Sequence, residues 1–368
     1  MVTEEIPRTM QRQRTVMRAM EPTDMPTDYH SALAQVTGRG VDLREPSAPA
    51  EGWLNLVEPG KGQWLSFSAF GTSLFGVDLN SAAVQAWSTA IGTLEEIDQA
   101  VATGTYGLMD ARRLHEAQAL AESLSGTLTH AIDDLKAIVT PLEGEGGAIT
   151  GTAAEALLEH LHLIQTVMTT IDAELTTDPS PAVAEVLRDA ASALTTFSQQ
   201  MSSVYAESRQ ILLNAVTVST DAIAQNVSAY LTGAGLLPNG QQYQALAPDP
   251  AAGLNYAKLV LGRYSSTVAG ALPYGMPPIS GDLTQPAVWD AAGAAITKLI
   301  TTEIDKMDAV ARTATAELSA AYEKATTRLV SAGSATPVLG KRHLRAAVRV
   351  QAPLAERQLA RAVTPHVP

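Results

Sequence analysis

Residues 114–142 read LHEAQALAESLSGTLTHAIDDLKAIVTPL, and this stretch decides the fold. Its apolar residues follow a 3-4-3-4 spacing through Leu114, Ala117, Ala121, Leu124, Leu128, Ala131, Leu135, Ile138 and Leu142. A period of 3.5 residues indicates helices that pack side by side along a straight seam. The seam predicts that Leu124→Asp or Leu161→Asp destroys folding, because each would bury a charge.

The same spacing recurs along the chain and predicts five long helices. They span about residues 80–102, 109–139, 152–176, 183–231 and 287–331. Asn80 or Asp78 caps the first helix, Pro141 ends the second and Gly333 ends the last. Only a few residues separate the third and fourth helices, so these two are expected to run antiparallel. We therefore predict an all-α fold, an elongated antiparallel bundle of about five long helices with heptad-like seams.

The remaining segments are punctuated by Gly and Pro, and they suggest a division into five parts. Residues 1–62 are predicted to be an irregular N-terminal arm, and 63–232 the helical bundle. Residues 233–286 hold eight Gly and seven Pro and read as a small head inserted between the last two long helices, with a short helix over 254–272. Residues 287–333 complete the bundle, and 334–368 form a basic C-terminal tail.

Large side chains gather between residues 63 and 76. The group comprises Trp64, Leu65, Phe67, Phe70, Leu74 and Phe75. We expect it to be a packing anchor at the end of the bundle, with a ligand pocket as the alternative.

The formal net charge is −13, but it is unevenly spread. The tail carries six Lys/Arg against one acid, and residues 8–18 carry four Arg and no acid. Arg342, Arg345 and Arg349 fall on one face of a helix, with Leu344 and Val348 on another, as in an amphipathic partner or membrane-surface helix. An acidic body argues against nucleic acid as a partner, while the basic ends suit an anionic membrane surface or an acidic protein.

The amino-acid composition limits the cellular compartments and the kinds of chemical site that this protein can have. The chain has no Cys, which excludes disulfides and thiolate metal sites. No apolar run is long enough for a transmembrane helix, and the first twenty residues lack the apolar core of a Sec signal peptide. We expect a soluble protein that is cytoplasmic or exported by a signal-independent route.

The candidate chemical residues do not form a recognisable site. His160 and His162 point in different directions from a helix, so they cannot share a metal ion. Asp133 and Asp134 resemble the start of the acidic metal-binding motif of helical terpene synthases, but Ala137 stands where a later carboxylate is needed. The carboxylate pairs Glu95/Glu96, Glu143/Glu145 and Glu303/Asp305 are assigned to helix surfaces or a loop, and the Gly-rich stretch 144–147 lacks the lysine of a phosphate loop. We predict no catalytic, cofactor-binding or metal-binding residues, no cofactor and no small-molecule substrate.

Two functions fit this outline. The first is a non-enzymatic structural or interaction protein, a helical rod that assembles with itself or with partner proteins through its arms and head. The second comes from the helix layout of residues 80–331, which resembles α-helical pore-forming toxins of the haemolysin-BL and cytolysin-A kind. The resemblance implies a membrane-active head, although those heads carry a hydrophobic hairpin and the segment 254–272 here contains Lys258 and Arg263.

Overall fold

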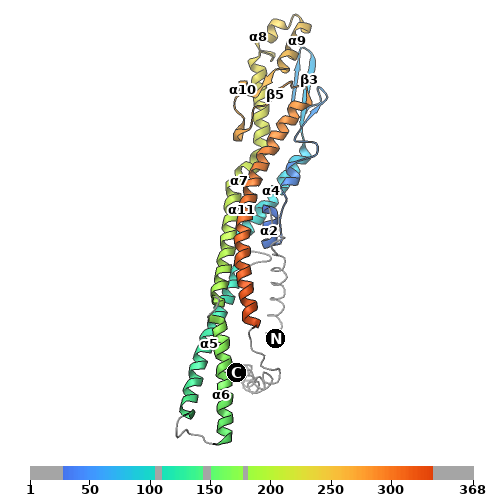
Figure 1. The fold of residues 1–368 in the computed structure, drawn as a ribbon. Helices are drawn as coiled ribbons and strands as arrows, with labels where there is room; N and C mark the ends of the chain where they lie inside the picture. Colours follow the sequence, from blue (N-terminus) through green and yellow to red (C-terminus); the bar gives the residue numbers. More distant parts are fainter. Residues whose placement is uncertain (1–27, 104–109, 144–150, 177–180, 335–368) are drawn as a thin grey trace, which may run out of the picture. The chain divides into compact units, whose positions relative to one another are not determined.

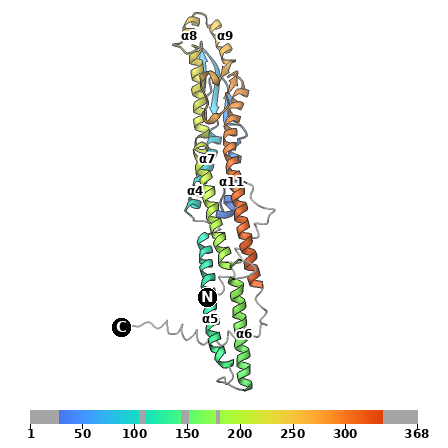
Figure 2. The same cartoon turned by 60° about the vertical axis from the view of Figure 1, so that its left-hand side comes forward.

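A computed structural model describes residues 28–103, 110–143, 151–176 and 181–334, and these residues are mostly helical (Figures 1 and 2). Helix accounts for 75% of the structure, which confirms the all-α class in outline. The chain divides into two compact units. The first comprises residues 1–110 and 194–319, and the second comprises 111–193 and 320–368. The predictions for the arginine-rich residues 8–18, the glycine cluster 144–147 and the tail after Ser334 lie outside the described residues.

The long helices lie where the apolar period places them. They are α4 (Ser81–Ala102), α5 (Ala111–Glu143), α6 (Thr152–Thr176), α7 (Val183–Gly233) and α11 (Pro286–Ser334). The expectation that the third and fourth of them run antiparallel is wrong, because α7 continues in the direction of α6 and the antiparallel partner of α6 is α5 (Figures 1 and 2). Asn80 caps α4, because its side-chain oxygen accepts a hydrogen bond from the Ala83 amide at 3.2 Å. The predicted stop at Pro141 is wrong. Pro141 lies inside the last turn of α5, where the missing amide affects only the end of the helix.

The N-terminal part is more ordered than predicted. Residues 28–62 are not irregular throughout, since they include α2 (Tyr29–Thr37), α3 (Arg44–Ser47) and strand β1 (Leu54–Val57). The Asp28 side chain caps α2 by accepting the Ser31 amide at 2.7 Å, and Gly38 ends it in the left-handed region at φ 75°. Leu33 and Val36 on this short helix are fully buried. The apolar contact with the rest of the unit outweighs the Gly and Pro residues that flank the helix.

The aromatic cluster forms strands rather than the start of the bundle. Strand β2 (Leu65–Ala69) and strand β3 (Thr72–Leu79) pair antiparallel, and β1 joins the other edge of β3 in the order β1-β3-β2. Leu65, Phe67 and Ala69 alternate with serines, which is the period-2 pattern of a half-buried strand. The cluster does serve packing, because Phe67 and Phe75 are buried and Phe75 lies 5.9 Å from the ring of Trp289.

A tight turn between β2 and β3 attaches the sheet to the head. Phe70 and Gly71 both have positive φ, 49° and 77°, as in the two-residue hairpin turns that match strand twist. The Phe70 ring stacks on Tyr243 at 4.5 Å. It also lies so close to Gly253 that a Cβ there would meet the ring at 2.6 Å. These contacts stabilise a left-handed backbone that an aromatic residue rarely adopts.

The head, residues 233–286, contains several short elements. They are α8 (Gln241–Leu246), α9 (Pro250–Leu261), β4 (Tyr264–Ser265), α10 (Ser266–Ala269), the 3-10 turn η2 (Pro273–Gly275) and β5 (Ser280–Gly281). The predicted helix 254–272 instead begins at Pro250, where Asp249 caps it, and ends before Gly262. Leu261, Tyr264 and Leu283 are buried, so the head has its own small core within the first unit.

Two tryptophans form the centre of the first unit, where α7 and α11 run side by side (Figures 1 and 2). Trp53 is fully buried, and its indole nitrogen donates to Thr297 of α11 at 3.0 Å. Trp87 of α4 donates to the Leu212 carbonyl of α7 at 3.0 Å. The two rings meet edge to face with centroids 6.5 Å apart. This pair therefore ties the sheet, α4, α7 and α11 together.

The predicted seam of the fourth long helix holds for its first half and then shifts. Val183 to Ser208 are buried at the expected positions of α7. The same spacing predicts Ile211, Ala215 and Val218 as the next seam residues. Ala215 is buried, but Leu212 is buried in place of Ile211, and Val218 is 38% exposed while Ser219 is buried. A pattern that repeats every 3.5 residues rotates by about 20° per heptad around a straight helix of 3.6 residues per turn. Over several heptads of α7 this rotation moves the buried stripe by one residue.

Candidate interaction surface

The histidines of α6 lie apart, as their spacing predicts. The His162 ring nitrogen contacts Glu143 at 2.6 Å, and both side chains are about half exposed. The His160 ring instead lies 2.8 Å from the Ala156 carbonyl of its own helix. Neither histidine meets a second potential metal ligand at these contacts.

The carboxylates considered from the sequence are mostly engaged in surface ion pairs. Asp133 faces Lys136 at 3.8 Å, Glu96 faces Arg39 at 3.2 Å, and Asp305 pairs with Arg44 at 2.7 Å. Glu303 is different, since it is only 5% exposed. The assignment of Glu303 to a helix surface is therefore wrong: its carboxylate pairs with Lys306 and accepts a hydrogen bond from Ser208 at 3.2 Å, which makes burial tolerable.

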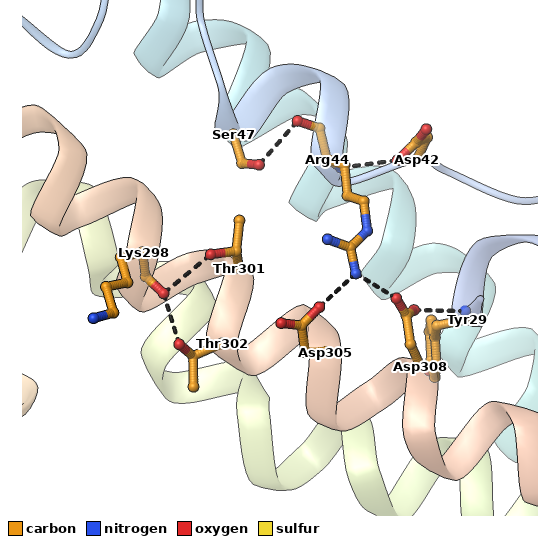
Figure 3. Close-up of polar contacts among 9 residues, drawn as sticks. All are labelled: Tyr29, Asp42, Arg44, Ser47, Lys298, Thr301, Thr302, Asp305 and Asp308. Atoms are coloured by element: carbon orange, nitrogen blue, oxygen red, sulfur yellow. Dashed lines mark hydrogen bonds and ion pairs between the residues drawn. The ribbon is translucent and has the colours of Figure 1, made fainter. Parts of the chain in front are cut away.

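A clamp that the sequence did not reveal attaches the N-terminal segment to α11 (Figure 3). The Arg44 guanidinium donates to Asp305 at 2.7 Å and to Asp308 at 2.6 Å. The other Asp308 oxygen accepts the Tyr29 amide at 2.8 Å, at the start of α2. Asp308 is 5% exposed, so this carboxylate depends on both donors. The clamp is a structural device, because all polar atoms of the Asp308 carboxylate face protein partners.

A second polar cluster lies between α4 and α7. Ser202 donates to Asp98 at 2.7 Å, and Arg209 donates to Glu95 at 2.8 Å. Burial raises the pKa of the half-buried Asp98 carboxyl, against the opposing effects of Ser202 and Arg209. Burial also raises the pKa of Tyr205 to about 12, so this phenol stays protonated at neutral pH.

Asp98→Asn should raise the free energy of unfolding at pH 7 and change it less at pH 4. The pKa of the Asp98 carboxyl is higher in the folded chain than in the unfolded chain, so this group favours the folded state below its unfolded pKa of about 4. That contribution to stability is lost as the pH rises through the folded pKa. Asparagine carries no charge to desolvate and can still accept the Ser202 hydroxyl. Urea unfolding at pH 4 and pH 7 tests this expectation, which fails if the substitution has the same effect at both pH values.

Neither a metal site nor a membrane span emerges from the described parts of the chain. There, no three His, Asp or Glu side chains gather closely enough to hold a metal ion. Among the helices of residues 28–334 outside the gaps, none combines the length and apolarity needed to cross a membrane.

The α5–α6 hairpin of the second unit presents a different kind of feature. Its helices are antiparallel, because Ser125 near the middle of α5 donates to Asp172 near the end of α6 at 2.9 Å, while Glu143 at the end of α5 meets His162. Ala154 and Ile132 are buried along the seam between them. The hairpin is held together by this seam of apolar and small polar residues.

Large apolar side chains remain exposed beside that seam. Their exposed fractions range from 45% to 67%, and they are Leu120, Leu124, Ile138, Leu157, Leu163 and Ile164. The predicted seam residues Leu124 and Ile138 of α5 are therefore only partly covered, and so are Leu157 and Ile164, at which the same spacing places the seam of α6. A two-helix pair can bury only the part of a wide apolar stripe that faces the partner, so its flank stays open. Because an aspartate at this half-exposed position would stay hydrated, we expect Leu124→Asp to leave the chain folded.

Five of these six side chains lie on one face of the hairpin. At about 100° per residue, Leu120, Leu124 and Ile138 are rotated from the buried line of α5 by roughly 80–120°. Leu157 and Ile164 are rotated from the buried line of α6 in the same sense, by roughly 60–80°. In an antiparallel pair, rotation in the same sense leads to the same face. We call the surface formed by these five residues the open face; Leu163 points to the opposite side of α6.

The open face sits on an acidic hairpin. The helical residues of α5 and α6 include nine Asp and Glu against three Lys and Arg, and all three basic residues belong to α5. By the same rotation Glu116 and Asp134 fall at its edge, and Arg113 in the first turn of α5 falls within it. An apolar strip on a surface with a large excess of one charge is typical of a surface that contacts another apolar, oppositely charged element.

Comparison with protein-family models, with curated proteins and with solved structures finds no match to this chain.

Proposed function

We propose that this chain is a non-enzymatic interaction protein that assembles with itself or with a partner protein. The observation that carries the proposal is the open face, on which five large apolar side chains of α5 and α6 line up without a covering element among the described residues. Patches of this kind on soluble proteins mark contact sites. The excess of carboxylates on the hairpin favours a basic, apolar partner segment, and a helix is the element that fits along a two-helix pair.

The double substitution Leu124→Asp/Ile164→Asp should weaken association at least tenfold without unfolding the chain. Both side chains are about half exposed, 45% and 49%, so the introduced charges remain hydrated in the isolated chain. In a contact they would be buried unpaired, and about 1.4 kcal/mol already corresponds to tenfold in affinity. Light scattering over a concentration series measures association of the unmodified chain and of the variant, and circular dichroism checks the fold.

Leu163→Asp provides the matched control. Leu163 is 47% exposed, next to Ile164 on the same helix, but it points away from the open face. It should associate like the unmodified chain. Association that responds equally to Leu163→Asp, or an unmodified chain that is monomeric at every concentration and binds no helical partner, contradicts the proposed function.

A second candidate is a membrane-active protein of the pore-forming kind, and one observation favours it. The head carries Leu259 and Val268 at its surface, 50% and 74% exposed. Such side chains suit insertion into a lipid interface. Release of a dye from anionic liposomes, lost in Leu259→Asp/Val268→Asp and kept in Leu124→Asp/Ile164→Asp, would favour this candidate over protein assembly.

A further inference from the structure

We propose that the basic C-terminal segment, residues 341–363, docks on the open face of its own chain and thereby controls access to it. This inference rests on the proposed function, because it concerns the regulation of that same contact surface. The position of the segment in the chain, its length, its charge and its apolar spacing each support it.

The course of α11 directs the chain toward the hairpin. Lys324 of α11 pairs with Asp189 of α7 at 3.1 Å. One turn later, Arg328 donates to the Pro181 carbonyl at 2.8 Å and to the Glu174 carbonyl in the last turn of α6. Successive turns of α11 thus approach the end of α6, and all these residues belong to the second unit. The described part of the chain therefore ends, at Ser334, six residues after this contact with the base of the hairpin.

The length of the following segment matches the surface. Ser334 lies six residues beyond Arg328, which is about 9 Å along a helix. From Glu174 back to Thr152, α6 offers about 33 Å, and 23 residues from 341 to 363 would cover about 35 Å as a helix. The chain needs no reversal to reach the open face, because α11 and α6 run in opposite directions.

The chemistry of the segment complements the face. Between residues 341 and 363 there are six Lys and Arg and one Glu, opposite a hairpin with a large excess of carboxylates. Leu344, Val348, Ala355 and Leu359 recur at intervals that a helix places on one side, with Pro353 interrupting the run. Apolar residues would meet Leu124, Ile138 and Ile164, and the arginines would approach the carboxylates of the hairpin. Both contacts are of the kind that a partner helix would otherwise supply, so tail and partner compete.

The absence of Cys from the chain permits a direct test by cross-linking. A chain with His160→Cys and Ala347→Cys is treated with a flexible bismaleimide, at a protein concentration below that at which the chains associate. His160 is exposed at the edge of the open face, whereas Glu159, equally exposed, points to the opposite side of α6. The pair Glu159→Cys and Ala347→Cys is therefore the matched control.

We expect the yield of the intramolecular cross-link to be at least about fivefold higher for the His160→Cys pair than for the Glu159→Cys control. Docking raises the local concentration of the Ala347→Cys thiol on one face of the hairpin only. Arg342→Glu/Arg345→Glu/Arg349→Glu should lower the yield toward that of the control. Equal yields for the two pairs, or products that are mainly cross-linked dimers, would overturn docking within the chain.

Association of the truncated chain, residues 1–334, supplies the second readout. If the tail covers the face for about nine tenths of the time, removing it should lower the concentration needed for association about tenfold when one open face takes part in the contact, and about a hundredfold when two do. Unchanged association together with equal cross-link yields overturns this inference and leaves the proposed function intact. A tail that cross-links to the face in a chain that never associates, even when truncated, instead contradicts self-assembly as the proposed function.

Discussion

Replacing Trp53 by alanine should lower the free energy of unfolding by about 3–5 kcal/mol, the range typical of a large aromatic removed from a packed core. Trp53 is fully buried and meets Trp87 edge to face at 6.5 Å. The substitution leaves a cavity, removes the ring contact and leaves the Thr297 hydroxyl without its indole donor. Few other single changes affect as many elements of the first unit at once.

Urea unfolding followed by circular dichroism measures this loss. Trp53→Phe should lie in between, since it keeps an aromatic ring and loses the hydrogen bond to Thr297, a contribution of about 1 kcal/mol. Tyr274→Ala is the control, because that side chain is 37% exposed and should matter little. A Trp53→Ala chain that unfolds within about 1 kcal/mol of the original would show that the tryptophan pair is not the centre of the unit.

Asp308→Ala should lower the free energy of unfolding by about 2 kcal/mol, because it leaves the buried Tyr29 amide without its acceptor and removes one of the two carboxylates that bind the half-exposed Arg44. The Arg44 guanidinium and the Tyr29 amide both lose a partner, and Asp308 itself is 5% exposed. The first turn of α2 should loosen as a consequence, which hydrogen exchange over residues 29–37 detects as faster exchange than in the unmodified chain.

Glu96→Ala is the matched control for the clamp. The Arg39–Glu96 pair also links the N-terminal segment to a long helix, but both side chains are exposed, 59% and 69%. Exposed pairs of this kind contribute at most about 1 kcal/mol. If Asp308→Ala and Glu96→Ala cost the same, or if residues 29–37 exchange unchanged in Asp308→Ala, the clamp does not hold α2.

The long helices could be predicted because their signal is local and repeated. A stripe of apolar residues over 25 to 51 positions outweighs any single exception, so the bounds of α6 and α7 agree with prediction within two residues. The exceptions are instructive. Pro141 lies inside α5, and the buried stripe of α7 shifts after Ser208, since neither a single proline near an end nor a drift of one residue changes the helical pattern.

The short elements were missed although their signals are present. Leu65, Phe67 and Ala69 alternate with serines, and Asp28 and Gly38 bracket α2 as cap residues. These signals extend over only five to nine residues. Over so short a stretch, the flanking Gly and Pro residues argue against a helix or strand as strongly as the pattern argues for one. What stabilises both elements is distant in sequence: Trp289 packs on Phe75, and Asp308 binds the start of α2.

The sequence by itself determined the helical class, the positions of the long helices and the contrast between an acidic body and basic ends, because each depends on residue types at short spacing. Only the tertiary structure decided which parts of the apolar stripes are covered. Glu303 and Asp308 are buried among partners from other segments, while Leu124 and Ile164 remain half exposed on the open face. Burial depends on which neighbour a helix meets and over what angle, and residue spacing along one helix does not contain that information.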